Sequence, residues 1–248
     1  MSKINIHNVS VNFRIYHDKS PSIKGYFSSL FKSNKDNAYS NYSAVKNVSL
    51  VIEPSERVGI IGHNGAGKST LLKTLCRIYE PSSGIIHVNG KIAPLLEIGA
   101  GFHPEFTGRE NIYLNGAILG LKKQQIRSLE DGIIRFAEVE EFIDTPVKYY
   151  STGMHMRLAF SLATATQPDI IILDEIFAGG DASFVANAKS RLREMIHKSD
   201  IMIMVSHDHE LVKSLCNRVI WMDHGQIVAD GLPDEIVRQY LAADAIGE

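Results

Sequence analysis

The sequence predicts an α/β protein in which a mixed sheet flanked by helices is joined by an antiparallel β subdomain and an inserted α-helical subdomain. Two observations predict this class. Strands and helices alternate at both ends of the chain, whereas the middle, approximately residues 105–165, has a helical pattern. A glycine-rich loop of the pattern G-x-x-x-x-G-K-[ST] stands between an apolar strand and a helix; it consists of Gly62, His63, Asn64, Gly65, Ala66, Gly67, Lys68, Ser69 and Thr70.

Four strands are expected in the first part of the chain. Apolar and polar residues alternate from Ile4 to Phe13 and again from Ala44 to Ile52, which is typical of half-buried strands. The apolar run from Arg57 to Ile61 predicts a buried strand that leads into the glycine-rich loop. A turn at 81–84 precedes a short strand over 85–90, which ends in Asn-Gly.

The glycine-rich loop predicts a phosphate site. Its glycines let backbone N–H groups surround the β- and γ-phosphates of a nucleotide, and the helix that follows adds its positive dipole end. Lys68 supplies a point charge for the terminal phosphates, and the Ser69 hydroxyl is a candidate Mg²⁺ ligand. The order of strand, loop and helix distinguishes this loop from a chance glycine-rich turn. We therefore expect a P-loop NTPase core that binds a nucleoside triphosphate.

A helical segment is expected from Thr107 to about Val139. Thr107 and Glu110 have the spacing of a capping box, in which both side chains satisfy backbone N–H groups at a helix N-terminus. Farther along, apolar residues recur at helical spacing and predict a second helix. These residues are Ile126, Leu129, Ile133 and Phe136.

Two later strands deliver polar side chains to one edge of the predicted sheet. The apolar strand from Ile170 to Leu173 is followed at once by Asp174 and Glu175, and the strand at 201–205 leads to His207. Open α/β sheets bind ligands at the carboxyl ends of their strands. We expect Asp174 to help hold Mg²⁺, Glu175 to orient or deprotonate the attacking water, and His207 to contact the γ-phosphate. By themselves, the two carboxylates are also compatible with a turn, and His207 with an ordinary surface histidine.

A second helix N-terminus that binds anions is expected at residues 150–157. Ser151 has the side chain of a helix cap, and Gly153 leaves backbone N–H groups open. Taken alone, this is only a cap. Its position in the sequence, between the phosphate loop and the strand that ends at Asp174, makes the anion-binding interpretation specific. A helix from Ser183 is expected after that strand.

A polar excursion, approximately residues 14–43, separates the first two strands and is too long for an ordinary connection. Ser20 and Pro21 are typical of a helix start. An amphipathic helix is predicted by apolar residues at one face: Ile23, Tyr26, Phe27, Leu30 and Phe31. This helix either packs on its own domain or meets a membrane protein or the bilayer interface, and the sequence leaves both readings open.

The composition is that of an ordinary soluble protein. The 248 residues are 44% hydrophobic and 22% charged, with a formal net charge of -2 and a mean hydropathy of -0.05. This balance gives no general attraction to nucleic acid or to anionic membranes. No apolar run approaches the ~18 residues of a membrane span. Cys76 and Cys216 favour a reducing compartment, and buried packing is the role expected of Cys76.

Together these motifs resemble the ATP-binding subunits of ABC transporters over nearly the whole chain. The loop at 62–70 is similar to the Walker A motif, residues 170–175 to the Walker B motif, and His207 to the H-loop histidine. Asp181 lies where the family has its D-loop, which implies a dimer contact. The resemblance implies one ATPase domain over residues 1–248, with ATP and Mg²⁺ as its cofactors.

The segment at 150–157 resembles the signature motif of that family but departs from it. Ser151, Gly153 and Arg157 keep the pattern, and the departures are Tyr150, Thr152 and Met154. Signatures of this form are similar to those of ATPases that export bacterial O-antigen, capsule or teichoic acid. Residues 95–111 resemble the same subfamily, which implies that Glu97 replaces the Q-loop glutamine near Mg²⁺.

The subfamily resemblance also implies further features of the chain. The sequence stops at Glu248, soon after the ATPase core, as in the short type without a C-terminal carbohydrate-binding domain. The predicted helix at 20–35 falls where the subfamily has an extra helix that faces its membrane partner. An aromatic side chain after the first strand stacks on adenine in this family; Tyr16 is the first candidate and Phe13 the second.

The resemblance thus implies an ATPase subunit of an exporter for a lipid-linked O-antigen or similar polysaccharide, peripheral at the cytoplasmic face of the bacterial inner membrane. Its expected partners are a second copy, head to tail across two ATP molecules, and a membrane-spanning permease that makes most of the contacts with the cargo. An ABC importer subunit and a soluble ABC ATPase remain alternatives. A nucleotide kinase would share the phosphate loop but has no use for residues 150–157.

Overall fold

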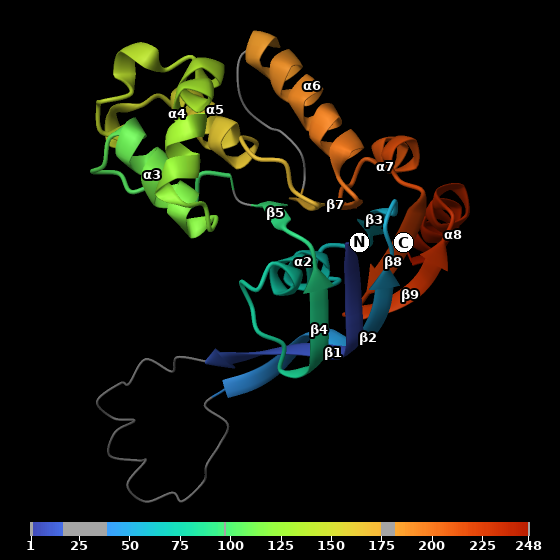
Figure 1. Cartoon of the computed structure of the whole chain (residues 1–248). Coiled ribbons are helices and arrows are strands. Elements are labelled where there is room, and N and C mark those ends of the chain that lie inside the picture. Colours follow the sequence, from blue (N-terminus) through green and yellow to red (C-terminus); the bar gives the residue numbers. More distant parts are fainter. Residues whose placement is uncertain (1, 17–38, 97, 175–181, 248) are drawn as a thin grey trace, which may run out of the picture.

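The computed structural model describes residues 2–16, 39–96, 98–174 and 182–247 (Figure 1). Two sheets, the helices that pack on them and a separate lobe of helices make up this part of the chain. The amphipathic helix expected at 20–35 lies outside the described residues.

Six of the described strands form a mixed sheet in the order β5-β6-β7-β3-β8-β9. Neighbouring strands run parallel except β8 and β9, which are antiparallel and joined by a turn at His224 and Gly225, both with positive φ. The mixed sheet predicted from the sequence is confirmed. The strands are β3 (Arg57–Ile61), β5 (Ile92–Leu95), β6 (Ile170–Asp174), β7 (Ile201–Val205), β8 (Arg218–Asp223) and β9 (Gln226–Gly231).

A second, antiparallel sheet has the order β2-β1-β4, as expected for the β subdomain. Its strands are β1 (Lys3–Tyr16), β2 (Tyr39–Ile52) and β4 (Ser83–Asn89). The register of β1 against β2 shifts between Ile6 and Val9, beside Asn8, whose φ is 48°. This bulge restores the buried face after an irregular spacing, so that Ile6 and Val9 are both buried.

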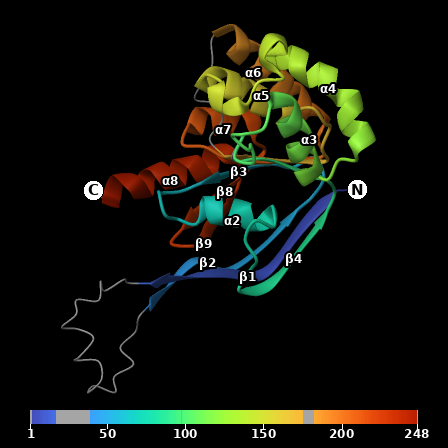
Figure 2. The same cartoon turned by 90° about the vertical axis from the view of Figure 1, so that its left-hand side faces the viewer.

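Helix α2 (Lys68–Leu75) lies between the two sheets, as Figure 2 shows. Three leucines, Leu71, Leu72 and Leu75, are at most 1% exposed and belong to one core cluster with residues of both sheets. Burial of three leucine side chains is worth several kcal/mol, at roughly 1.5–3 kcal/mol each. The helix that starts at the phosphate loop is therefore held firmly by the core.

Three helices cover the opposite face of the mixed sheet (Figure 1): α6 (Ala182–Lys198), α7 (His209–Leu215) and α8 (Pro233–Gly247). They bury apolar side chains against Ile171, Leu173 and their neighbours in the sheet. Helices α7 and α8 and strand β5 are absent from the sequence-based prediction. The helical residues of this second core cluster are Leu192, Met195, Ile196, Val212, Ile236, Val237 and Tyr240.

The remaining helices form a lobe at one end of the molecule (Figure 1): α3 (Gly108–Ile118), α4 (Lys123–Ala137) and α5 (Thr152–Ala163). Two short 3-10 turns, Glu140–Phe142 and Val147–Tyr149, connect α4 to α5. The capping box is confirmed, because the Glu110 backbone N–H donates to Thr107 Oγ1 at 3.1 Å and the Thr107 N–H donates to Glu110 Oε2 at 2.8 Å. The second helix predicted from the spacing of apolar residues is α4, in which Ile126 and Ile133 are buried.

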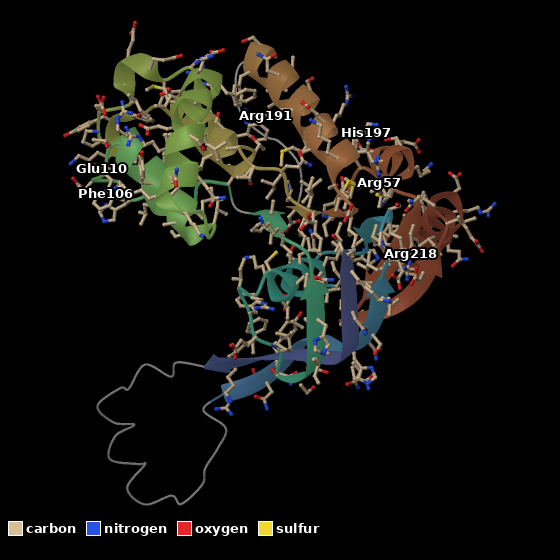
Figure 3. All side chains as sticks on the ribbon, in the orientation of Figure 1. Arg57, Phe106, Glu110, Arg191, His197 and Arg218 are labelled. Carbon is tan, nitrogen blue, oxygen red and sulfur yellow. The ribbon has the colours of Figure 1, made fainter. Side chains whose placement is uncertain are left out.

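An aromatic cluster joins this lobe to the rest of the molecule. Phe136 of α4, Phe160 of α5 and Phe184 of α6 have ring centroids 5.7 to 6.2 Å apart. The Arg191 guanidinium lies 4.2 Å from the centroid of the Phe136 ring, and its Nε–H donates to the Thr164 carbonyl at 3.3 Å. Figure 3 shows Arg191 on the side of α6 that faces the lobe. Such contacts between helices couple the lobe to α6.

Within the ranges that the structure describes, no helix has the length and apolar character that crossing a bilayer requires.

Candidate nucleotide site

Three neighbouring strands of the mixed sheet end at the same edge. In the ladder, Asp174 of β6 is opposite Val205 of β7, which is opposite Ile60 of β3. From these ends the chain continues into the phosphate loop and to His207. Because the strands are parallel, the loop, Asp174 and His207 meet at the carboxyl edge of the sheet, as predicted.

A cavity of about 510 Å³ opens at this edge. Its volume is within the usual range of small-molecule sites. Gly62 and His63 start the phosphate loop but do not line the cavity. The lining residues are Phe13, Tyr42, Ala44, Asn64, Gly65, Ala66, Gly67, Lys68, Ser69, Thr70, Leu96, Asp174, Val205 and His207.

Two glycines fix the path of the phosphate loop. Gly62 has a φ of 143° and Gly67 a φ of 98°, conformations that residues with a Cβ rarely adopt. A Cβ at Gly62 would lie 2.1 Å from the Met222 carbonyl oxygen, and one at Gly67 would lie 2.2 Å from that of Ala44. Only glycine fits at both positions, so the loop keeps the shape in which its N–H groups are available to an anion.

The Lys68 ammonium group is held inside the loop. Its side chain is buried, at 6% exposure, and Nζ donates to the carbonyl oxygens of Gly62 at 2.6 Å and His63 at 2.9 Å. These bonds stabilise a charge that burial would otherwise penalise. The same ammonium faces the cavity, where phosphate oxygens would be stronger partners because the hydrogen bonds would be charge-assisted.

Ser69 and Asp174 provide a suitable donor set for Mg²⁺. A hydroxyl and a carboxylate line the same cavity as the phosphate-binding backbone, and hard oxygen donors are the ligands that Mg²⁺ prefers. Among the described residues no group of three His, Cys, Asp or Glu side chains has the arrangement of a metal centre. The donor set thus fits an ion that is completed by phosphate oxygens and water, which is the usual coordination of Mg²⁺ in nucleotide sites.

His207 stands in a short turn between β7 and α7. The Asp208 N–H donates to Ser206 Oγ at 3.0 Å, and Asp208 Oδ1 accepts from the Leu211 N–H at 3.0 Å and so caps α7. Residues on both sides of His207 are therefore fixed by hydrogen bonds. The side chain at 207 is exposed at the wall of the cavity, where it can reach a bound phosphate.

The aromatic wall of the cavity is formed by Phe13 and Tyr42, which are opposite each other in the β1–β2 ladder. Phe13 packs edge-on against Tyr79 at 5.3 Å, and the Tyr42 hydroxyl donates to the Gly65 carbonyl at 3.3 Å. Of Tyr16, the first candidate for adenine stacking, the structure describes only the backbone. Sequence reasoning missed Tyr42, although its pairing with Phe13 follows from the register of the two strands.

Ser151 and Gly153 are placed apart from this cavity, since neither is among the described residues that line it. Ser151 caps α5, and its Oγ accepts from the Met154 N–H at 3.2 Å. A Cβ at Gly153 would meet nothing closer than Ser151 Oγ at 3.8 Å. The folded chain itself therefore does not require glycine at position 153.

Two of the three signature departures have local structural reasons. The Tyr150 hydroxyl donates to the Phe142 carbonyl at 2.8 Å and lies so close to Gly108 that a Cβ there would be 2.3 Å from it. Burial raises the pKa of Tyr150 to about 12, so it remains a neutral donor. Met154 packs against the core of the helical lobe. Nothing in the structure explains Thr152.

Three of the predicted site residues lie outside the described residues: Glu97, Glu175 and Asp181.

Both cysteines lie within the described residues, and their role is to pack in the interior. Burial raises the pKa of the Cys76 and Cys216 thiols to about 12, which keeps them protonated and unreactive, as the packing role expected of Cys76 requires.

Comparison with known proteins identifies relatives of this chain. Residues 45–178 match the family described as ABC transporter. The chain is 38% identical over 248 residues to an O-antigen export system ATP-binding protein of Klebsiella pneumoniae, covering 98% of each protein. It is 37% identical over 238 residues to a teichoic acids export ATP-binding protein of Listeria monocytogenes, covering 96% of this chain and 69% of that protein. A similar O-antigen export protein of Myxococcus xanthus is 44% identical over 206 residues, 83% of this chain, which spans only 47% of that longer protein.

Solved structures give the same fold. An ATP-binding subunit of an ABC transporter has a TM-score of 0.68 at 22% identity and covers 96% of this chain and 92% of its own. A dimeric ATP-binding cassette in a post-hydrolysis state, bound to ADP and Pi, has a TM-score of 0.67 at 20% identity and covers 93% of this chain and 98% of its own. At these identities the likeness establishes the fold, and it confirms the expected α/β architecture.

Proposed function

This chain belongs to the ABC transporter family, and from that membership we propose that it is the ATP-binding and hydrolysing subunit of a polysaccharide exporter. The proposed cargo is a lipid-linked O-antigen or a similar surface polysaccharide, which the exporter moves across the bacterial inner membrane. The observation that carries the ATPase assignment is one cavity that unites the phosphate loop, Asp174 and His207 from three adjacent strand ends. The names of the relatives support the cargo.

In the proposed ATP complex the phosphate loop holds the triphosphate through its backbone N–H groups. Lys68 would leave the carbonyls of Gly62 and His63 for the terminal phosphates, and Ser69 and Asp174 would hold Mg²⁺, which would screen the phosphate charge. Phe13 offers a ring face or edge to the adenine base from the opposite wall. Because stacking on a ring needs no particular base, most of the binding energy comes from the phosphates.

Hydrolysis is proposed to use Glu175 and His207. Glu175 orients or deprotonates the water that attacks the γ-phosphorus, and the bond from that phosphorus to the ADP oxygen breaks. His207 donates a hydrogen bond to the γ-phosphate and stabilises its developing charge. Asp174 and Glu175 are consecutive at the strand end, so one carboxylate can serve the metal while the other serves the water.

A second copy is proposed to complete each site. Ser151 and Gly153 lie on the helical lobe, apart from the cavity of their own chain, and glycine at 153 has no internal packing reason. A backbone N–H at the start of α5 is suited to bind a phosphate, and the absence of a Cβ would permit close approach. Two chains arranged head to tail would thus enclose two ATP molecules, with Asp181 at the contact between them.

The proposed location is the cytoplasmic face of the bacterial inner membrane, beside a membrane-spanning permease. Closure of the two copies on ATP would move the helical lobes, and the permease would receive that motion through the segment near Glu97 and the lobe. The sugar itself would be contacted mainly by the permease.

The test of the ATPase assignment is Glu175→Gln. We expect this variant to bind ATP as the wild type does, to lose turnover by about 10²- to 10⁴-fold, and to accumulate as dimers on a sizing column with ATP. Undiminished hydrolysis would exclude Glu175 from the reaction.

The test of the cargo is genetic. The gene is deleted in a strain that displays a surface polysaccharide, and the wild-type chain or Glu175→Gln is supplied in its place. We expect surface polysaccharide to return only with the wild type, and the chain to copurify with a permease. A normal surface in the deletion strain would contradict the proposed cargo.

A further inference from the structure

The aromatic side chain of Tyr240 in helix α8 lies against the phosphate loop and against the start of α7. Tyr240 is 7% exposed and packs in the core cluster on the helical face of the mixed sheet. Three other rings surround it. They come from the phosphate loop, from the segment after His207 and from strand β8: His63, His209 and Trp221.

The ring distances are those of direct aromatic packing. The centroid of Tyr240 is 5.4 Å from that of His63, 5.3 Å from that of His209 and 5.7 Å from that of Trp221. The His209 and Trp221 rings meet it edge to face, at interplanar angles of 64° and 79°. Aromatic side chains at such distances prefer these tilted geometries, so each contact fixes orientation as well as distance.

A second contact joins the same helix to the phosphate loop. Asp244 follows Tyr240 by one helical turn, and its Oδ1 lies 3.4 Å from Nε2 of His63. Both side chains are about half exposed, at 52% for His63 and 47% for Asp244, so solvent weakens this pair. The buried ring of Tyr240 is therefore the stronger link between α8 and His63.

We propose that Tyr240 is a positioning residue of the nucleotide site, which holds the phosphate loop and the His207 segment in fixed relation to each other. The His63 carbonyl oxygen accepts a hydrogen bond from the Lys68 ammonium at 2.9 Å. A shift of His63 would therefore move an acceptor that holds the Lys68 ammonium in place. His209 begins α7 and follows His207 by two residues, so the position of its ring sets the direction of the turn that carries His207. Tyr240 touches both, and it reaches no reacting atom itself.

This inference rests on the proposed function, since it concerns the same ATP site. Two variants separate a positioning role from a general packing role. Tyr240→Leu removes the ring but keeps an apolar side chain, and Tyr240→Phe restores the ring without the hydroxyl. Val237→Ala is the matched control, because Val237 is 2% exposed in the same helix and core cluster but belongs to none of the ring contacts.

The measurement is the affinity for a slowly hydrolysed ATP analogue with Mg²⁺, followed by kcat and KM for ATP and by thermal unfolding. We expect Tyr240→Leu to weaken analogue binding about fivefold or more and to lower kcat, with Tyr240→Phe equal to the wild type. Val237→Ala should lower the unfolding temperature with unchanged affinity. Equal affinity in Tyr240→Leu and the wild type, or an equal loss in Val237→Ala, would overturn the proposal.

A double-mutant cycle keeps the proposal testable if Tyr240→Leu folds poorly. His63→Ala removes the same ring contact from an exposed position, and Tyr240→Phe with His63→Ala shows whether the tyrosine hydroxyl contributes once that contact is gone. We expect His63→Ala alone to weaken analogue binding and Tyr240→Phe to add nothing to that loss; full affinity in His63→Ala would contradict the proposal. A wild-type chain that binds the analogue but does not hydrolyse ATP would count against the proposed ATPase reaction and would leave this comparison of affinities valid.

Discussion

Gly67 is one of the two glycines that fix the shape of the phosphate loop. Its φ of 98° and the 2.2 Å approach of the Ala44 carbonyl oxygen to a Cβ both exclude other residues. We predict that Gly67→Ala loses ATP binding and about 1–3 kcal/mol or more of stability, because the strained backbone and the displaced carbonyl add their costs. Urea unfolding and nucleotide binding measure the two effects.

Gly132 supplies the control for that substitution. It lies inside α4, no atom is within 4 Å of a Cβ built there, and its φ is not positive. Gly132→Ala should stabilise the chain by about 0.4–1 kcal/mol, because alanine restricts the unfolded chain and fits a helix better. If both substitutions cost the same, the loop geometry would not be the cause.

At the residue scale, the sequence predicts that Lys68, Ser69, Asp174 and His207 meet at one edge of the sheet, but it does not predict the placement of the aromatic residues beside them. Lys68, Ser69, Asp174 and His207 could be assigned because each follows a strand in a pattern that fixes its position at the sheet edge. Which aromatic ring lines the cavity depends on where β1 leaves the sheet and on how β2 pairs with it. Such register is set by bulges that no local pattern shows.

The capping box at the start of α3 is a single element with a pH-dependent contribution. Hydrogen bonds from the Thr107 backbone N–H, and then from its hydroxyl, lower the pKa of Glu110. A carboxylate whose folded pKa is depressed stabilises the fold above its unfolded pKa of about 4.3, and this stabilisation is lost as pH falls through the folded pKa. Glu110→Ala should therefore lower the unfolding temperature at pH 7 but much less at pH 2.

The position of Glu110 makes the measurement specific. It lies on the helical lobe, as Figure 3 shows, and is not among the described residues that line the nucleotide cavity. ATP affinity at pH 7 should therefore stay unchanged in Glu110→Ala. A difference between the two proteins that is as large at pH 2 as at pH 7 would show that the carboxylate charge is not the cause.

Elements with a strong local signal were predicted, whereas those determined by tertiary contacts were not. The apolar runs of β3 and β7, the capping box of α3 and the Ser151 cap of α5 all have local patterns. Helix α8 begins with proline and acidic residues but shows a weak apolar face, and β5 is too short to carry a periodicity. Both are stabilised by packing against a sheet that forms from distant segments, which is information that a local window lacks.

At the scale of the whole molecule, the chain consists of a nucleotide-binding core and a helical lobe joined by the Phe136–Phe160–Phe184 cluster. This junction contacts α6, which is the first described element after the Asp174 strand end. Residues 175–181, which include Glu175 and Asp181, lie in the sequence between strand β6 and helix α6, the helix that contacts the lobe. Helix α6 packs on the sheet through Leu192, Met195 and Ile196 and on the lobe through Phe184, so it joins these two parts of the molecule.

Gly153 lies in the segment that is proposed to complete the ATP site of a second copy. Gly153 is the second residue of α5, where an acidic side chain is favourable for the helix and has open space in the folded chain. Gly153→Asp should therefore unfold at the same temperature as the wild type or slightly higher. Across a dimer interface the same carboxylate would face the phosphates of the partner's ATP and repel them. We predict lost hydrolysis without lost stability.

Mixing two inactive variants tests whether the site is composite. Lys68→Ala damages the phosphate loop, and Gly153→Asp damages the signature segment. In a mixed dimer, the intact loop of the Gly153→Asp chain meets the intact segment of the Lys68→Ala chain, so one complete site is restored. Hydrolysis by the mixture should exceed that of either variant alone and should rise with protein concentration, because the mixed dimer must first assemble. A mixture no more active than its components would mean that each chain builds its site without a partner.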